Sequence, residues 1–133
     1  SVNGTQSSGT SESEIRLYTT MATWCAVCRS HLPEMQQLRS VFGPESLVVY
    51  GVPMDAADDA SKLSDYVKRY KPAYTLLTDL TEDQRKEVQQ LVSDTLKTDA
   101  LPSTVVTDGK GRVLMITAGL PTVSELKKIL QSL

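Results

Sequence analysis

The residues best suited to chemistry in this 133-residue chain lie in one short segment, MATWCAVCRSHLP (residues 21–33). Cys25 and Cys28 are the only cysteines, Trp24 is the only tryptophan and His31 is the only histidine. Two cysteines separated by two residues can pair with each other, with a partner protein, or around a metal ion. The segment therefore has to be weighed for redox, metal-binding and purely structural roles.

The expected position of Cys25 favours a redox role. Residues 14–20 are rich in strand formers, and apolar residues recur at helical spacing over about residues 26–41. Cys25 would then lie where a helix begins, and the unpaired N–H groups and the helix dipole there favour the reactive thiolate. Cys28 follows one turn later on the same side. The spacing therefore supplies an exposed nucleophile and a resolving thiol for dithiol–disulfide exchange.

Three other interpretations remain open at this point. A structural zinc site usually needs four ligands, and the chain has no second C-x-x-C or H-x-x-H motif. A copper or zinc carrier that uses Cys25, Cys28 and His31 as ligands is still an alternative. So is a pair of buried cysteines that only pack, and so is a binding module that exchanges no electrons.

Composition is that of one soluble domain. The chain is 40% hydrophobic and 23% charged, with a formal net charge of −2 at pH 7, and it is long enough to bury a core. No basic stripe is present, so we expect no nucleic-acid partner, and no apolar run is long enough to span a membrane. The polar residues 1–13 predict a disordered linker or an artificial remnant before a domain over residues 14–133.

Strand and helix signals alternate along the chain. Strands are expected over residues 14–20, 47–52, 74–79, 103–108 and 112–118, the last two forming a hairpin around the turn at residues 108–111. Helices are expected over about residues 26–41, 58–70, 81–98 and 122–133. This order predicts an α/β fold, a central mixed β-sheet flanked by helices on both faces, with an antiparallel hairpin at one edge.

Particular residues are expected to shape these helices. Pro33 should bend the first helix because proline has no N–H to donate, and Asp58 is expected to cap the second. Capping boxes at Thr81/Gln84 and Thr122/Glu125 are expected to begin the third and fourth.

The segment ATWCAVCRSHLP resembles the active-site segment of the thioredoxin superfamily. It is most similar to that of the TlpA/ResA-like thiol–disulfide oxidoreductases, whose pattern runs roughly W-x-T-W-C-x-x-C-R-x-E-x-P. Pro33 matches the helix-bending proline of that family, and ALPST (residues 100–104) matches its cis-proline loop, again followed by a hairpin and a terminal helix. The resemblance covers about residues 14–133 and implies a thioredoxin-like fold.

The resemblance also implies a role for each residue of the motif. Cys25 would be the attacking thiolate and Cys28 the buried resolving thiol. Trp24 would form part of the surface where a partner docks. Pro102 would be cis and face the cysteines, and the Leu101 backbone would pair with an extended substrate segment.

At the level of the whole protein, the resemblance implies a monomeric thiol–disulfide oxidoreductase without an organic cofactor. Its partners would be protein disulfides or dithiols and an upstream thiol electron donor. The family works outside the cytoplasm, usually tethered to a membrane, and some members keep apocytochrome c cysteines reduced. No peroxidatic T-x-x-C pattern with a catalytic arginine is present, so we do not expect a peroxiredoxin.

Two positions depart from the family pattern. Thioredoxins carry a buried acid six residues before the first cysteine, where this chain has Thr19. TlpA/ResA-like proteins often carry a glutamate three residues after the second cysteine, where this chain has His31. We hypothesise that His31 takes over the proton transfer, since imidazole changes its protonation near neutral pH. A protonated imidazole would also favour the thiolates and make the protein more oxidising than a relative with glutamate.

Overall fold

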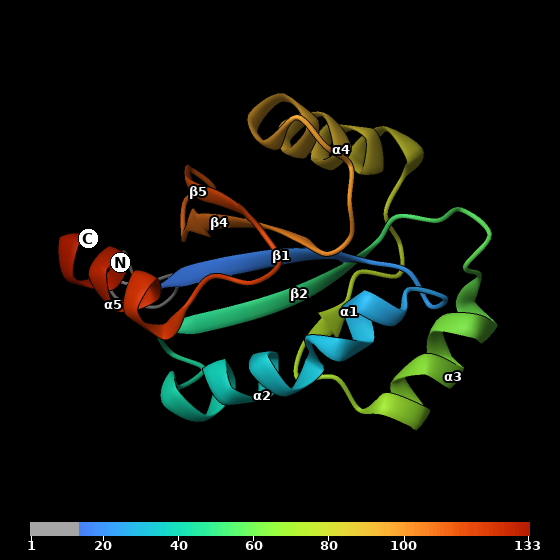
Figure 1. Cartoon of the computed structure of the whole chain (residues 1–133), viewed down its shortest axis with the longest axis horizontal. Coiled ribbons are helices and arrows are strands. Elements are labelled where there is room, and N and C mark those ends of the chain that lie inside the picture. Colours follow the sequence, from blue (N-terminus) through green and yellow to red (C-terminus); the bar gives the residue numbers. More distant parts are fainter. Residues whose placement is uncertain (1–13) are drawn as a thin grey trace.

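The computed structural model describes residues 14–133, which form a five-stranded mixed sheet in the order β3-β2-β1-β4-β5 (Figure 1). The strands are β1 (Ile15–Met21), β2 (Leu47–Pro53), β3 (Thr75–Leu76), β4 (Ser103–Asp108) and β5 (Val113–Ala118). β1, β2 and β3 run parallel, β4 is antiparallel to β1, and β5 is antiparallel to β4. The predicted α/β class and the edge hairpin are confirmed. The linker expected over residues 1–13 lies outside the described residues.

Helices cover both faces of the sheet, as predicted. They are α1 (Ala26–Ser30), α2 (Leu32–Val41), α3 (Ala60–Tyr70), α4 (Glu82–Leu96) and α5 (Val123–Ser132). α2 and α5 lie on one face, and α4 lies on the other, over β4 and β5 (Figure 1). In the described part of the chain, none of these helices has the length and apolar character needed to cross a membrane.

The core fixes the strand that leads into the cysteine segment. Ile15 and Leu17 of β1 are fully buried and pack against Met35 and Leu38 of α2 and against Leu126 of α5. Full burial of each such side chain contributes about 1.5–3 kcal/mol. β1 is also paired on both sides, with β2 and with β4. The end of β1 therefore presents residues 22–25 from a rigid position.

The helix expected over residues 26–41 is broken into two. His31 ends α1 and also begins α2, and Pro33 lies in the first turn of α2. Proline fits there because the first N–H groups of a helix have no partner within it. The break separates the short α1, which holds the cysteines, from α2, which packs on the sheet.

Helix capping follows the sequence except at α3. Both predicted capping boxes are present, at the starts of α4 and α5. The expectation that Asp58 caps α3 is wrong, because Asp59 accepts the Lys62 N–H at 2.9 Å and is the N-cap. Asp58 is buried and faces the segment before Cys25 instead.

Candidate active site

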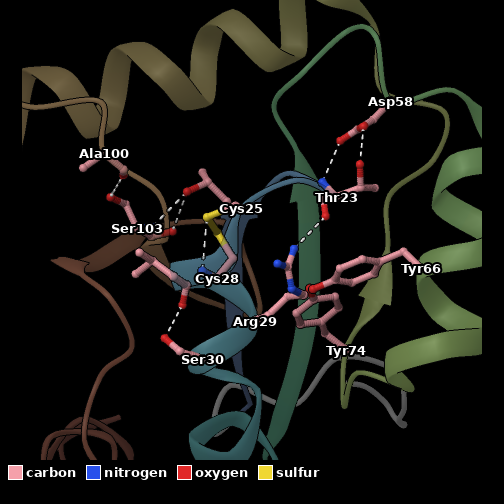
Figure 2. Close-up of a disulfide and its surroundings, with 12 residues drawn as sticks. Thr23, Cys25, Cys28, Arg29, Ser30, Asp58, Tyr66, Tyr74, Ala100 and Ser103 are labelled. Atoms are coloured by element: carbon pink, nitrogen blue, oxygen red, sulfur yellow. Dashed lines mark hydrogen bonds between the residues drawn. A yellow bond between two sulfur atoms is a disulfide. The ribbon is translucent and has the colours of Figure 1, made fainter.

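Cys25 and Cys28 are joined by a disulfide at the start of α1 (Figure 2). Cys25 is the N-cap of the helix, and its Sγ accepts a hydrogen bond from the Cys28 backbone N–H at 3.1 Å. A donor aimed at this sulfur stabilises a thiolate more than a thiol. The backbone is therefore arranged to favour ionisation of Cys25 once the disulfide is reduced.

Cys25 opens onto a groove of about 660 Å³, which we call the front groove. Its lining comes from the cysteine segment, from the loop after β2, from α4 and from the segment before β4: Trp24, Cys25, Ala26, Val27, Met54, Asp55, Ala56, Gln89, Asp99, Ala100 and Leu101. Trp24 and Val27, beside the disulfide, are 63% and 56% exposed. Cys25 itself is only 6% exposed, so the expectation of an exposed sulfur is wrong, because the walls of the groove shield it.

Cys28 borders a different space, which we call the back cavity. It measures about 10 Å³ and is lined by Thr19, Thr20, Met21, Cys28, His31, Leu32, Met35, Tyr74, Pro102 and Leu120. A single water needs roughly 10–15 Å³, so this space has room for a proton carrier no larger than one water. The cavity that Cys28 borders is thus too small to admit a substrate protein.

Hydroxyl groups replace the buried acid of thioredoxins beside the back cavity. Thr19 and Thr104 are both buried, with their Oγ1 atoms 3.0 Å apart. Thr104 donates its hydroxyl hydrogen to the Gly119 carbonyl at 2.7 Å, so Thr19 must be the donor to Thr104, since each hydroxyl has one hydrogen. The chain Thr19–Thr104–Gly119 is neutral and fully paired.

His31 lies between the start of α2 and the loop after β5. Its Nδ1 is 3.3 Å from Oε1 of Glu34 but is not aligned for a hydrogen bond. Its other edge faces Gly119, where an added Cβ would lie 3.5 Å from the His31 Cε1. The imidazole therefore lies between an exposed carboxylate and the loop after β5, and it lines the back cavity together with Cys28.

Tyr74 also lines the back cavity, and it stays protonated. Burial raises its pKa far above the ordinary tyrosine value, and the hydrogen bond with Tyr66 raises it further. No carboxylate occurs among the described residues that line this cavity. Among the described residues that line it, the ionisable side chains are therefore Cys28, His31 and the protonated Tyr74.

The predicted cis-proline loop lies against the disulfide. The Leu101–Pro102 peptide bond is cis. Leu101 packs in an apolar cluster with both cysteines and lines the front groove, while Pro102 lines the back cavity. Thr20 holds the loop to β1, because its Oγ1 accepts the Ser103 N–H at 2.8 Å and donates to the Ser103 carbonyl at 3.2 Å.

Asp58 holds the segment before Cys25, a role that the sequence did not reveal. Its carboxylate accepts the Thr23 N–H at 2.8 Å and the Thr23 hydroxyl at 2.5 Å (Figure 2). Arg29 donates to the Thr23 carbonyl at 3.0 Å and lies over the ring of Tyr70, 5.5 Å from its centre. The N–H, the hydroxyl and the carbonyl of Thr23 are therefore all hydrogen-bonded, which fixes the chain segment that precedes Cys25. The only sequence signal was the presence of two acids where a helix needs one cap.

Asp55 holds Trp24 at the rim of the front groove. The indole N–H donates to Asp55 at 2.7 Å, and the Ala57 N–H donates to the same carboxylate at 2.9 Å. These bonds, first the one from Ala57 and then the one from Trp24, lower the pKa of Asp55 below its ordinary value. The indole is therefore an exposed but oriented surface beside the disulfide.

The metal-carrier alternative gains no support from the arrangement of side chains. Within residues 14–133, no three or more histidine, cysteine, aspartate or glutamate side chains come together as a group that could hold a metal ion. The residues proposed for it, Cys25, Cys28 and His31, instead divide between a disulfide and a contact with Glu34.

Comparisons with known proteins agree with this geometry. A family model described as AhpC/TSA matches residues 7–116. Three similar solved structures are a thiol-disulfide isomerase from Corynebacterium glutamicum, a thio-disulfide isomerase from Thermus thermophilus and a thiol:disulfide interchange protein DsbE from Chlorobium tepidum. Their sequence identities are 18%, 23% and 18%, and their TM-scores are 0.65, 0.65 and 0.61.

In the same order, the alignments cover 92%, 88% and 90% of this chain and 81%, 77% and 77% of the solved chains. A search of curated protein sequences gave no significant match. Similarity at this level of identity establishes the fold, which is thioredoxin-like.

Proposed function

The chain belongs to the AhpC/TSA family, and we propose that it is a thiol–disulfide oxidoreductase that exchanges its Cys25–Cys28 pair with partner proteins. The observation that carries the proposal is that the two cysteines border different spaces. Cys25 borders an open groove of about 660 Å³, and Cys28 borders a cavity of about 10 Å³. Thiol–disulfide exchange through a mixed disulfide needs one accessible sulfur and one protected sulfur.

In the reducing direction, the Cys25 thiolate attacks one sulfur of a substrate disulfide. A mixed disulfide forms, and the other substrate sulfur leaves as a thiolate that takes up a proton. The Cys28 thiolate then attacks the Cys25 sulfur and expels the remaining substrate thiolate. The substrate has gained two electrons and the protein is left with the Cys25–Cys28 disulfide, which an upstream thiol donor must reduce again.

His31 is the proton acceptor for Cys28 in this proposal. It shares the back cavity with Cys28, and the carboxylates that relatives use are absent, since Thr19 occupies one of their positions and His31 the other. Neutral imidazole can accept the Cys28 proton as that thiol attacks. Once protonated, imidazole favours nearby thiolates, which stabilises the reduced protein and raises its reduction potential.

The remaining roles concern docking and location. Trp24 and the Leu101 backbone form the docking surface for an extended substrate segment, and cis-Pro102 packs behind the disulfide. We place the protein outside the cytoplasm as a tethered monomer, with apocytochrome c among the substrate classes to test. The resemblance of the cysteine segment to TlpA/ResA-like proteins supports this assignment, and the name of the Chlorobium tepidum structure, a thiol:disulfide interchange protein DsbE, supports the exchange reaction.

Trapping tests the exchange reaction. Reduced Cys28→Ser protein should attack a disulfide-bonded protein such as insulin and remain attached through Cys25, because the resolving thiol is gone. The adduct should be visible on a non-reducing gel and should disappear when the sample is treated with dithiothreitol. Cys25→Ser is the matched control and should form no adduct. Equal trapping by both variants, or by neither, would contradict the proposed roles.

Substitution of His31 tests the proton transfer. His31→Ala should slow resolution of the mixed disulfide, because the proposed proton acceptor of Cys28 is lost. His31→Glu should restore a fast second step but lower the reduction potential, since a carboxylate disfavours thiolates. Equilibration with glutathione measures the potential. Unchanged reduction potentials and resolution rates in both variants would remove His31 from the mechanism.

A further inference from the structure

The front groove has a one-sided charge. Among the described residues that line it, the charged side chains are Asp55 and Asp99, and no lysine or arginine contributes. Asp55 comes from the loop after β2, and Asp99 comes from the segment between α4 and the cis-proline. The two carboxylates thus reach the groove from two different segments of the chain.

Apolar groups make up most of the remaining lining. Trp24, Val27, Met54 and Leu101 are joined there by three alanines, and Gln89 of α4 adds an uncharged polar side chain. The volume of the groove, about 660 Å³, falls within the range of pockets that bury most of a drug-sized ligand. An extended peptide with small or apolar side chains fits this lining.

Nearby cations do not cancel the acidic character within the groove. Lys62 and Arg85 are close enough to Asp55 to affect it electrostatically. However, Lys62 donates to the Ala57 carbonyl at 3.2 Å, and Arg85 donates to the Pro53 carbonyl at 3.1 Å and pairs with Glu82. Neither cation lines the groove. Asp55 is ionised at neutral pH, because two N–H donors favour its charged form.

We infer that the front groove selects an extended, cysteine-bearing protein segment with lysine or arginine close to the reacting cysteine. The inference rests on the proposed exchange function and names the class of substrate for it. A cationic segment in the groove would meet two carboxylates, Asp55 and Asp99, while an acidic segment would be repelled by both. Such complementarity acts mainly on the association rate and weakens as salt rises.

The test measures attack by the reduced protein on short capped peptides. Each peptide carries one cysteine disulfide-bonded to mercaptoethanol, flanked by lysines, alanines or glutamates. The wild-type protein should react with the lysine peptide about tenfold faster than with the glutamate peptide at low salt. The ratio should shrink toward one at high salt.

Charge-matched variants locate the effect. Asp55→Asn keeps an oxygen that can accept the Trp24 N–H, so it removes the charge and preserves the contact. In Asp55→Asn/Asp99→Asn the lysine-to-glutamate ratio should fall to about twofold or less. Asp65→Asn/Asp83→Asn changes the net charge equally at exposed positions of α3 and α4 outside the groove lining, and should keep the wild-type ratio.

Several outcomes would overturn the inference. A wild-type ratio near one would show that the carboxylates do not select, and an equal loss in both double variants would show that only net charge matters. The neutral bis(hydroxyethyl) disulfide separates this failure from that of the proposed function. If reduced wild-type protein attacks this compound but shows no charge preference, only the inference fails. If it attacks no disulfide at all, the proposed function fails with it.

Discussion

The two sides of the disulfide differ in almost every physical property. On the front side, Cys25 meets a wide groove with exposed apolar side chains and two carboxylates. On the back side, Cys28 meets a cavity of about 10 Å³ with paired hydroxyls, a protonated tyrosine and one histidine. The exposed fractions of the two cysteines, 6% and 5%, conceal this difference. What each sulfur can react with is set by the space it borders.

The supports of the two sides differ as well. The front segment is held by acids from the loop between β2 and α3, where Asp55 binds Trp24 and Asp58 binds Thr23. The back is held by neutral hydroxyls on β1 and β4 and by the carbonyl of Gly119. Carboxylates therefore occur on the front side, where we propose that a partner docks, whereas no carboxylate is among the described residues that line the back cavity. A protonation event in such a poorly solvated space has a large effect.

The largest expected effect is on the alkylation of the two thiols. In the reduced protein, iodoacetamide should modify Cys25 at least about tenfold faster than Cys28, because Cys25 has both the groove and the directed Cys28 N–H. Mass spectrometry of samples quenched over time measures both rates, and the single variants Cys25→Ser and Cys28→Ser check each one alone. Equal alkylation rates would contradict the proposed difference in reactivity between Cys25 and Cys28.

The next effect concerns the anchor of the front segment. Asp58→Ala should lower the free energy of unfolding by about 2–3 kcal/mol, because two hydrogen bonds to a buried carboxylate are lost. Asp59→Ala is the matched control and should cost only about 1 kcal/mol, as the loss of a helix cap. Urea denaturation measures both. If Asp59→Ala lowered the free energy of unfolding more than Asp58→Ala, the structural role proposed for Asp58 would be contradicted.

A smaller effect is expected from two glycines with positive φ. Gly119 (φ 67°) faces His31, whereas Gly111 (φ 88°) faces open space. Alanine at either position should cost about 1–2 kcal/mol from the left-handed backbone. At position 119 the added methyl group would also lie 3.5 Å from the His31 Cε1 and restrict movement of the ring, so only Gly119→Ala should alter the rate of resolution. Identical exchange kinetics in both variants would show that His31 does not act in resolution of the mixed disulfide.

Local chemistry explains which parts of the fold were predictable. The capping boxes at Thr81 and Thr122 and the turn at residues 108–111 depend on neighbours within a few residues, and each was confirmed. The cis bond before Pro102 is rare in general and followed only from the family resemblance. The sequence predicted only a bend in the helix over residues 26–41, whereas the structure has a break at His31. Pro33 indicates that the helix is interrupted but does not indicate whether it bends or breaks.

Contacts between distant residues explain what the sequence concealed. Asp58 and Asp59 are equally good caps by type, and the choice depends on Thr23, which is 35 residues away from Asp58. The front groove likewise combines Asp55, Gln89 and Asp99 from three separate segments. None of these residues belongs to a motif, so their role became visible only when the fold brought them together around Cys25.

The smallest effect is a titration at the rim of the groove. Ionised Asp55 accepts the N–H groups of Trp24 and Ala57, and these bonds lower its pKa in the folded protein. Their contribution to stability is therefore complete above the ordinary aspartate range, near pH 3.9, and is lost as the pH falls through the lowered pKa. Trp24 is the only tryptophan, so its fluorescence should report this step directly.

The fluorescence of the oxidised protein should change with a midpoint below about pH 3.9, and circular dichroism should confirm that the fold persists through the change. Asp55→Asn should abolish the transition, because an amide accepts the indole N–H at every pH. Asp99→Asn should leave the transition in place, because Asp99 shares the groove but makes no bond to the indole nitrogen, which is paired with Asp55. A transition that survives Asp55→Asn would mean that another group holds the indole, and the front side would then lose the fixed docking surface that sets it apart from the back.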